Sequence, residues 1–182
     1  MTAASYQVVF ITGAAGGIGA EVARRLHAKG ARLVLTDLDQ AQLNKLGAEL
    51  GDERVLTVVA DVRDRAAMQA AADHAIDRFG GIDTVMANAG IASYGSVLQV
   101  DPEAFRRLID VNVLGVQRVC THFLPLVERG GRIVNVTSAA GPSWLAKQPA
   151  EDHRFFLDAN VTWPDLRARV EKEAAVDGEE QA

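Results

Sequence analysis

Cysteine and clustered positive charge are both scarce in this sequence. The single cysteine, Cys120, excludes an internal disulfide and leaves no cysteine cluster for a structural metal site. Lys and Arg number 19 against 24 Asp and Glu, which gives a net charge of −5. Nucleic acids and anionic membranes bind clustered positive charge, so we expect a partner of neither kind.

Long apolar runs are also missing. The apolar run at 8–11 is far shorter than the roughly 20 residues that cross a membrane, and no basic segment precedes it. The three histidines on predicted helices, His27, His74 and His122, have no carboxylate or cysteine spacing that would bind a metal. We therefore expect a soluble, cytoplasmic protein without a metal site.

Glycine and tryptophan are distributed unevenly along the chain. Fifteen of the 16 glycines lie in residues 1–141, whereas Trp144 and Trp163 both follow them. This shift predicts a boundary between a domain at 1–141 and an atypical tail at 142–182. In the tail we expect no strand, a short helix at 164–175 and a disordered acidic end.

Short apolar runs alternate with amphipathic segments before this boundary. The expected strands are 7–12, 32–37, 54–61, 82–88 and 132–138. Their nearly continuous apolarity is typical of strands that are covered on both faces, as in a parallel sheet. Helices are expected at 17–29, which Gly30 would end, and at 101–129, with Asp101 as its N-cap. Alternation at this rhythm predicts an α/β fold with a doubly wound parallel sheet.

A glycine-rich turn, "FITGAAGGIGAEV", joins the first strand to the first helix. Glycines allow the backbone to approach a ligand closely, and the following helix N-terminus favours a pyrophosphate. Asp37 ends the second strand, where an acid can accept hydrogen bonds from an adenosine ribose. Its charge would repel a 2′-phosphate, so NAD is favoured over NADP. A tight turn that only packs, and a helix cap at Asp37, remain alternatives, although Asp39 is the better cap candidate.

Five motifs occur in an order that resembles the classical short-chain dehydrogenase/reductase family. They are TGAAGGIG at 12–19, AD at 60–61, NAG at 88–90, Asn112 in DVNVLG and Ser138 in NVTSAAG. The resemblance covers residues 6–141. It implies a Rossmann sheet with strand order 3-2-1-4-5, here truncated after the fifth strand, and a sheet edge there that is poorly covered.

The resemblance also implies a set of site residues. Those expected to bind the cofactor are Thr12, Gly13, Gly17, Ile18, Gly19, Asp37, Asp61, Val62, Asn88, Ala89 and Gly90. Ser138 and Asn112 are the expected catalytic residues. Each has a simpler alternative: Asp61 could cap the next helix, Asn88 could form a turn, and Asn112 and Ser138 could bond only to backbone.

One part of the family's catalytic apparatus is missing from the sequence. The resemblance implies a tyrosine about a dozen residues after Ser138, with a lysine one turn later that brings the phenol pKa towards neutrality. No tyrosine follows Tyr94. Two lysines follow Ser138, Lys147 and Lys172, but neither has a usable acid four residues before it. His153 stands at about the expected distance, but its charged surroundings favour a solvated surface histidine.

These observations leave two functions open. The first is an NAD-dependent oxidoreductase that transfers hydride between nicotinamide and a small alcohol or carbonyl substrate, impaired by the missing tyrosine and lysine. The second is a non-catalytic NAD(H)-binding module or a subunit that pairs with intact homologues. A truncated product that never folds stably is a third interpretation. A homo-oligomer is possible, and the tail is a frame-shifted, recombined or functional segment.

Overall fold

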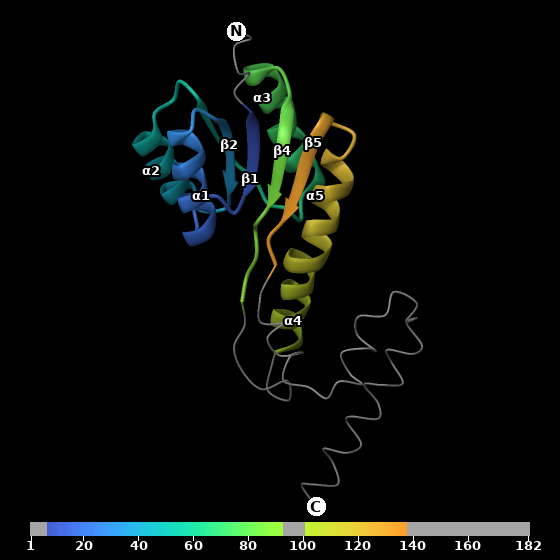
Figure 1. The fold of residues 1–182 in the computed structure, drawn as a ribbon. Helices are drawn as coiled ribbons and strands as arrows, with labels where there is room; N and C mark the ends of the chain where they lie inside the picture. The colour runs from blue at the N-terminus through green and yellow to red at the C-terminus, as the bar shows by residue number, and fades with distance from the viewer. Residues whose placement is uncertain (1–6, 93–100, 138–182) are drawn as a thin grey trace, which may run out of the picture. The chain divides into compact units, whose positions relative to one another are not determined.

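The computed structural model describes residues 7–92 and 101–137, which form a five-stranded parallel sheet covered by helices (Figure 1). Its strands are β1 (Val8–Thr12), β2 (Arg32–Asp37), β3 (Val55–Val59), β4 (Ile82–Ala87) and β5 (Val127–Asn135). The order across the sheet is β3-β2-β1-β4-β5, with every neighbouring pair parallel. The predicted doubly wound sheet and its 3-2-1-4-5 strand order are confirmed.

The helices form a layer on each face of the sheet. They are α1 (Gly17–Ala28), α2 (Gln40–Leu50), α3 (Arg65–Phe79), α4 (Pro102–Ile109), the π-helix η1 (Asp110–Gly115) and α5 (Val116–Phe123). Apolar side chains of α1 and α2 pack on one face, and those of α3 and α5 pack on the other. Successive strand residues therefore enter opposite cores: Phe10 packs with α3 and α5, and Ile11 packs with α1 and α2.

Short polar side chains and glycines set the helix ends. Asp39 caps α2 by accepting a hydrogen bond from the Gln42 backbone N–H, as expected. Asp64, and not Asp61, caps α3, so the alternative role for Asp61 as the helix cap is wrong. Asp101 caps α4 as predicted, with Pro102 at its first position.

The single helix predicted at 101–129 is wrong in two respects. The structure divides this segment into α4, η1 and α5, and α5 ends at Phe123. Pro125 explains the end, because a proline has no N–H to donate and restricts the residue before it. Consequently β5 begins at Val127 rather than at 132, and it ends at Asn135 rather than at 138.

Several predictions fall outside the described residues. These are the roles of Ser138 and His153 and all expectations for the tail at 142–182. Among the described residues, residues up to Thr137 belong to one compact unit. No helix within 7–92 and 101–137 is long and apolar enough to cross a membrane.

Candidate cofactor-binding site

A cleft of about 400 Å³ lies where β1, β2, β3 and β4 end. Open α/β sheets bind ligands at this carboxyl edge, where the strand order reverses. Nine residues predicted to bind a cofactor line the cleft: Gly13, Gly17, Ile18, Asp37, Asp61, Val62, Asn88, Ala89 and Gly90. The other two, Thr12 and Gly19, are not among its lining residues and support the wall from behind.

The glycine-rich turn contains two glycines that have no room for a side chain. Gly13 adopts a φ of 63°, and a Cβ there would lie 2.7 Å from the Cα of Ala89. A Cβ on Gly19 would lie 2.4 Å from the carbonyl oxygen of Gly13. Gly17 differs, because a Cβ there would meet nothing within 4 Å. Gly13 and Gly19 therefore pack the turn, whereas Gly17 leaves space open on the cleft side.

Helix α1 begins at this turn without a side-chain cap. Its N-cap residue, Gly16, makes no side-chain hydrogen bond, and Gly16, Gly17 and Ile18 all line the cleft. The first N–H groups of a helix have no partner within the helix, and its dipole places positive charge at this end. The arrangement is suited to an anion such as a phosphate group.

Thr12 and Asn88 lock the ends of β1 and β4 together. The Thr12 hydroxyl accepts hydrogen bonds from the backbone N–H groups of Asn88 and Ala89, each at 3.1 Å. The Asn88 side-chain amide donates to the carbonyls of Thr12 and Gly13, at 3.0 and 2.9 Å. Asn88 thus bonds to backbone, as its simpler alternative proposed, and by doing so it shapes the floor of the cleft.

Asp37 lies at the end of β2 and is tied to the same turn. Its Oδ2 accepts a hydrogen bond from the Ala15 N–H at 2.9 Å, and its Oδ1 accepts from the N–H groups of Leu38 and Asp39. A carboxylate has about four lone-pair sites, so these bonds leave an acceptor position on Oδ2. Because Asp37 lines the cleft, that position is available to a donor on a ligand.

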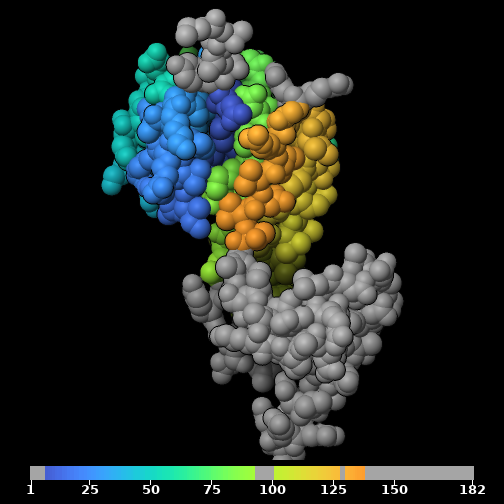
Figure 2. Space-filling view, in the orientation of Figure 1, coloured from blue at the N-terminus to red at the C-terminus, as the bar shows by residue number. Residues whose placement is uncertain are grey.

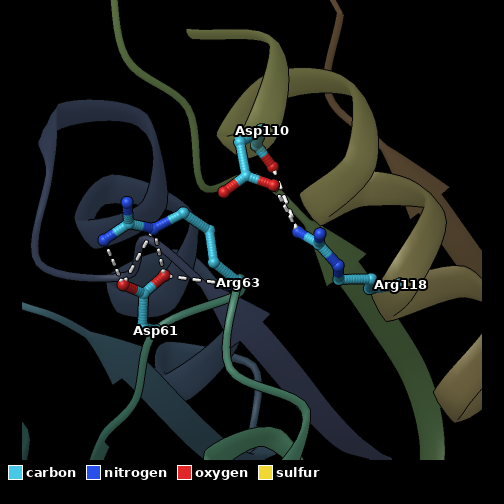
Figure 3. A network of polar contacts seen from close by, with 4 residues as sticks. All are labelled: Asp61, Arg63, Asp110 and Arg118. Atoms are coloured by element: carbon cyan, nitrogen blue, oxygen red, sulfur yellow. Dashed lines mark hydrogen bonds and ion pairs between the residues drawn. The ribbon is translucent and has the colours of Figure 1, made fainter. Parts of the chain in front are cut away.

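Asp61 and Arg63 form an ion pair at the rim of the cleft (Figure 3). The Arg63 guanidinium donates through Nε and Nη2 to both carboxylate oxygens, and its shortest contact is 2.6 Å. These side-chain hydrogen bonds are the main reason why the pKa of Asp61 is lowered, and partial burial opposes them. Asp61 is therefore held as a carboxylate, which only accepts hydrogen bonds.

Asn112 lies in the π-helix η1, opposite the segment after β4. Its Oδ1 accepts from the Ile91 N–H at 2.9 Å, and its Nδ2 donates to the Ile91 carbonyl at 2.8 Å. Both ends of the side-chain amide are thus bonded to backbone, as the simpler alternative for this residue proposed. In this conformation Asn112 positions the 88–91 segment, which explains an asparagine inside a helix.

Several residues that line the cleft were not predicted from the sequence. Among them are Gly16, Leu38, Arg63, Ile91, Arg107 and Val111. Two of them carried a signal: Arg63 stands two residues after Asp61, and Arg107 precedes Val111 by four residues on a predicted helix. Within the two described ranges no group of three His, Cys, Asp or Glu side chains is placed to hold a metal ion.

The fold and this cleft define a Rossmann-type nucleotide-binding class, and comparison with known proteins names the family. A family model described as short chain dehydrogenase matches residues 7–150. The chain belongs to the short-chain dehydrogenase family.

Individual relatives agree with this assignment. Meso-2,3-butanediol dehydrogenase from Serratia marcescens is 37% identical over 136 residues, which cover 74% of this chain and 54% of that protein. Dehydrogenase/reductase SDR family member 7B from Bos taurus is 35% identical over 180 residues, which cover 91% of this chain and 54% of that protein. The chain thus spans about half the length of the curated relatives it matches.

Solved structures show the same partial coverage. A 3-ketoacyl-(acyl-carrier-protein) reductase from Brucella melitensis, complexed with NADH, superimposes with a TM-score of 0.70 at 35% identity. That match covers 75% of this chain and 59% of the reductase. A short-chain dehydrogenase/reductase from Burkholderia phymatum, in complex with NAD, gives a TM-score of 0.71 at 32% identity, with coverage of 81% and 56%.

Proposed function

We propose that this chain binds NAD(H) in the cleft and is the nucleotide-binding part of an oxidoreductase that acts on a small alcohol or carbonyl compound. The observation that carries the proposal is the cleft itself, which combines an uncapped helix N-terminus with the carboxylates of Asp37 and Asp61. Two solved relatives that the chain resembles were determined with NADH or NAD. The chain's own family membership supports the same cofactor class.

The residues present fit such a cofactor. The turn at 13–19 would receive the pyrophosphate, because Gly17 leaves open space beside unpaired helix N–H groups. Asp37 would accept a hydrogen bond from the adenosine ribose through its remaining acceptor position on Oδ2. Asp61 and Val62 would contact the adenine, and the floor built by Asn88, Ala89 and Gly90 would lie beneath the cofactor.

NAD is favoured over NADP by the charges at the end of β2. A 2′-phosphate would approach the Asp37 carboxylate, and like charges at this distance repel each other. Ala14 and Ala15 occupy the neighbouring turn positions where a cationic side chain would offset that repulsion. We therefore expect tighter binding of NADH than of NADPH.

Catalysis needs more than the cofactor site. The bound nicotinamide would supply or accept the hydride, and the protein would have to move one proton at the substrate oxygen. We propose that Ser138 holds that oxygen and that turnover is impaired, because the sequence contains no tyrosine after Tyr94. Asn112 then acts by positioning the segment through Ile91.

A second candidate is a non-catalytic NAD(H)-binding module that pairs with another subunit, and the missing tyrosine favours it. In either case we propose that the nucleotide-binding domain is 1–141 and that 142–182 is a separate tail. Turnover separates the two candidates. A screen of secondary alcohols with NAD, repeated with Ser138→Ala, would detect slow, Ser138-dependent NADH production only if the chain is catalytic.

Binding is tested by calorimetric titration of the full chain with NADH and NADPH. We expect NADH to bind at least ten-fold more tightly, and Asp37→Arg to reduce or reverse that preference, because one unit-charge contact is worth about 1–3 kcal/mol here. Asp77→Arg is the matched control, since it makes the same charge change on the exposed side of α3, away from the cleft. Equal binding of both dinucleotides by the unmodified chain would refute the proposed selectivity.

A further inference from the structure

The helical segment at 102–123 contains two arginine–carboxylate pairs of different kinds. Arg106 bonds to Glu103, three residues away, and their side chains are 72% and 75% exposed. Arg118 bonds to Asp110, eight residues away, at 2.8 Å, and these side chains are only 35% and 33% exposed. Side chains that are neighbours on a helix surface stand three or four residues apart. The first pair is therefore an ordinary surface pair, whereas the second connects two different turns.

The Asp110–Arg118 pair spans the π-helix η1 (Figure 3). Asp110 is the first residue of η1, and Arg118 lies in the first turn of α5, beyond the end of η1. Turns of this kind are rare, and they usually interrupt an α-helix once, often at a functional site. One residue of an α-helix turns the chain by about 100°. If the offset that η1 introduces changed, Asn112 would therefore rotate away from Ile91.

The two ends of this pair differ in how firmly the core holds them. Helix α5 contributes Val119 and Phe123, which are 1% and 0% exposed, to the hydrophobic core. Arg118 directly precedes Val119, so its backbone is anchored. Helix α4, by contrast, has no buried residue. The bond from Arg118 thus ties Asp110, at the junction of α4 and η1, to a helix that the core keeps in place.

The π-helix η1 contacts the wall of the cleft at two places. The side-chain amide of Asn112 exchanges two hydrogen bonds with the backbone of Ile91, at 2.9 and 2.8 Å, and Ile91 lines the cleft next to Gly90. A Cβ on Gly115, at the end of η1, would lie 2.9 Å from the side chain of Val62, which also lines the cleft. A displacement of η1 would therefore be felt in the cleft.

We propose that Arg118 is a positioning residue that fastens η1 through Asp110, and so holds Asn112 on Ile91 at the wall of the cleft. The consequence for cofactor binding rests on the proposed function, whereas the consequence for Ile91 concerns the chain alone. Hydrogen bonds between charged groups are stronger than neutral ones, and partial burial of this pair limits its screening by water. Without the bond, η1 opens locally while the rest of the fold stays intact.

The test combines amide hydrogen exchange at Ile91, measured by NMR on the full chain, with calorimetric titration of NADH. Exchange at Ile91 reports the contact directly, because this N–H donates to Asn112. Arg118→Met removes the donor and keeps an apolar stem, and we expect it to accelerate that exchange by about ten-fold or more. It should also weaken NADH binding by about three-fold or more. Arg106→Met is the matched control, since Arg106 does not line the cleft, and it should change neither quantity.

Two further variants test whether Arg118 acts through Asp110. Arg118→Lys retains a charged donor and should keep exchange at Ile91 within about three-fold of the unmodified chain. Asp110→Ala removes the acceptor and should accelerate the exchange as much as Arg118→Met does. Because both substitutions break the same bond, the double variant should exchange no faster than either single variant.

Each outcome decides the question. Unchanged exchange at Ile91 in Arg118→Met, or an equal acceleration in Arg106→Met, would overturn the inference whether or not NADH binds. Additive accelerations in the double variant would overturn it too, because the residues would then act separately. Unfolding of Arg118→Met would contradict a local role, since we expect its unfolding midpoint to match that of Arg106→Met. Faster exchange with unchanged NADH affinity would refute the link to the cleft, and an unmodified chain that binds no NADH would refute only the proposed function.

Discussion

The strands β1 and β5 belong to the same sheet but differ in how completely they are buried. All five residues of β1 are buried, and Phe10 and Ile11 are 0% exposed. In β5, by contrast, no residue whose burial is described is fully buried, and Val134 is 44% exposed. In Figure 2 the atoms of β5 form a broad orange surface, whereas the dark-blue atoms of the β1 region show only as a narrow strip between their neighbours.

This difference distinguishes two parts of the carboxyl edge of the sheet: the cofactor cleft and the strand expected to lead to Ser138. The cofactor cleft is built from the ends of β1, β2, β3 and β4, and of these strands β1, β2 and β4 are mostly buried. The strand expected to lead to Ser138 is the outermost strand of the described sheet. We therefore expect that substitutions in β5 which leave the core intact do not weaken nucleotide binding.

The largest effect should come from emptying the core under β1. Phe10 packs against Phe123 of α5 with ring centroids 4.5 Å apart, so Phe10→Ala would leave a cavity between the sheet and the layer formed by α3 and α5. We expect a loss of about 3–5 kcal/mol in the free energy of unfolding, against less than about 1 kcal/mol for Val134→Ala. Chemical denaturation measures both. Equal losses would show that β5 is as tightly packed as β1 and would remove the contrast.

A smaller effect is expected from the glycine-rich turn. Gly19→Ala would push a methyl group against the Gly13 carbonyl at 2.4 Å, and we expect a loss of about 1–3 kcal/mol in stability. Gly17→Ala meets no neighbour and should leave stability unchanged or slightly higher, yet it should weaken NADH binding. Thermal unfolding and calorimetry together separate the two variants. Identical behaviour of both would show that the turn does not divide into packing and ligand-facing glycines.

The sequence predicted most of this fold because the strong signals were local. Four of the five strands were placed within two residues of the observed bounds, since their apolar runs are short and flanked by turns or caps. The error at 101–129 has a physical origin. Amphipathic periodicity continues through Leu124, and neither the stop at Pro125 nor the π-helical turn at 110–115 changes the pattern of apolar residues.

For the site, glycine and acid spacing predicted which residues meet in the cleft, but not how they bond. Asn88 and Asn112 were expected at the site, yet their side chains bond to the backbone of Thr12, Gly13 and Ile91. Arg63 was not predicted although it stands two residues after Asp61, because that spacing alone does not show that its guanidinium bonds to the Asp61 carboxylate. Contacts of this kind depend on side-chain orientation in three dimensions, which no sequence pattern encodes.

The helix caps offer a third test of the contrast between well-buried and exposed elements. Asp64 caps α3, which contributes Met68 and three alanines to the core, whereas Asp101 caps α4, which has no buried residue. Asp64→Ala should therefore cost about 0.5–2 kcal/mol in global stability. Asp101→Ala should only fray its helix, which hydrogen exchange at 102–109 would detect. A larger global loss for Asp101→Ala would reverse this ranking.

The smallest effect concerns pH and His122 on α5. Burial is the main cause of its lowered pKa; the charge of Arg65 adds to it, and Asp73 opposes it. Above the unfolded pKa of about 6.5 the residue is neutral in both states, so it has no effect. As pH falls below that value the unfolded chain binds the proton first, and stability should decrease until the lowered folded pKa is passed.

His122→Gln should reduce this decrease as pH falls below about 6.5, measured by denaturant unfolding at each pH. Thr121→Ser, at an exposed position next to His122 on α5, changes no ionisable group and is the control that should leave the slope unchanged. If His122→Gln has the same pH slope as the unmodified chain, the burial of this imidazole does not penalise its protonation.

The most direct test of the central claim is the fluorescence of NADH titrated against the purified, folded full chain. We predict a saturable change with a dissociation constant below about 1 mM, which Gly17→Ala weakens without unfolding the chain. A cooperatively folded chain that gives no saturable signal at millimolar NADH would contradict the account.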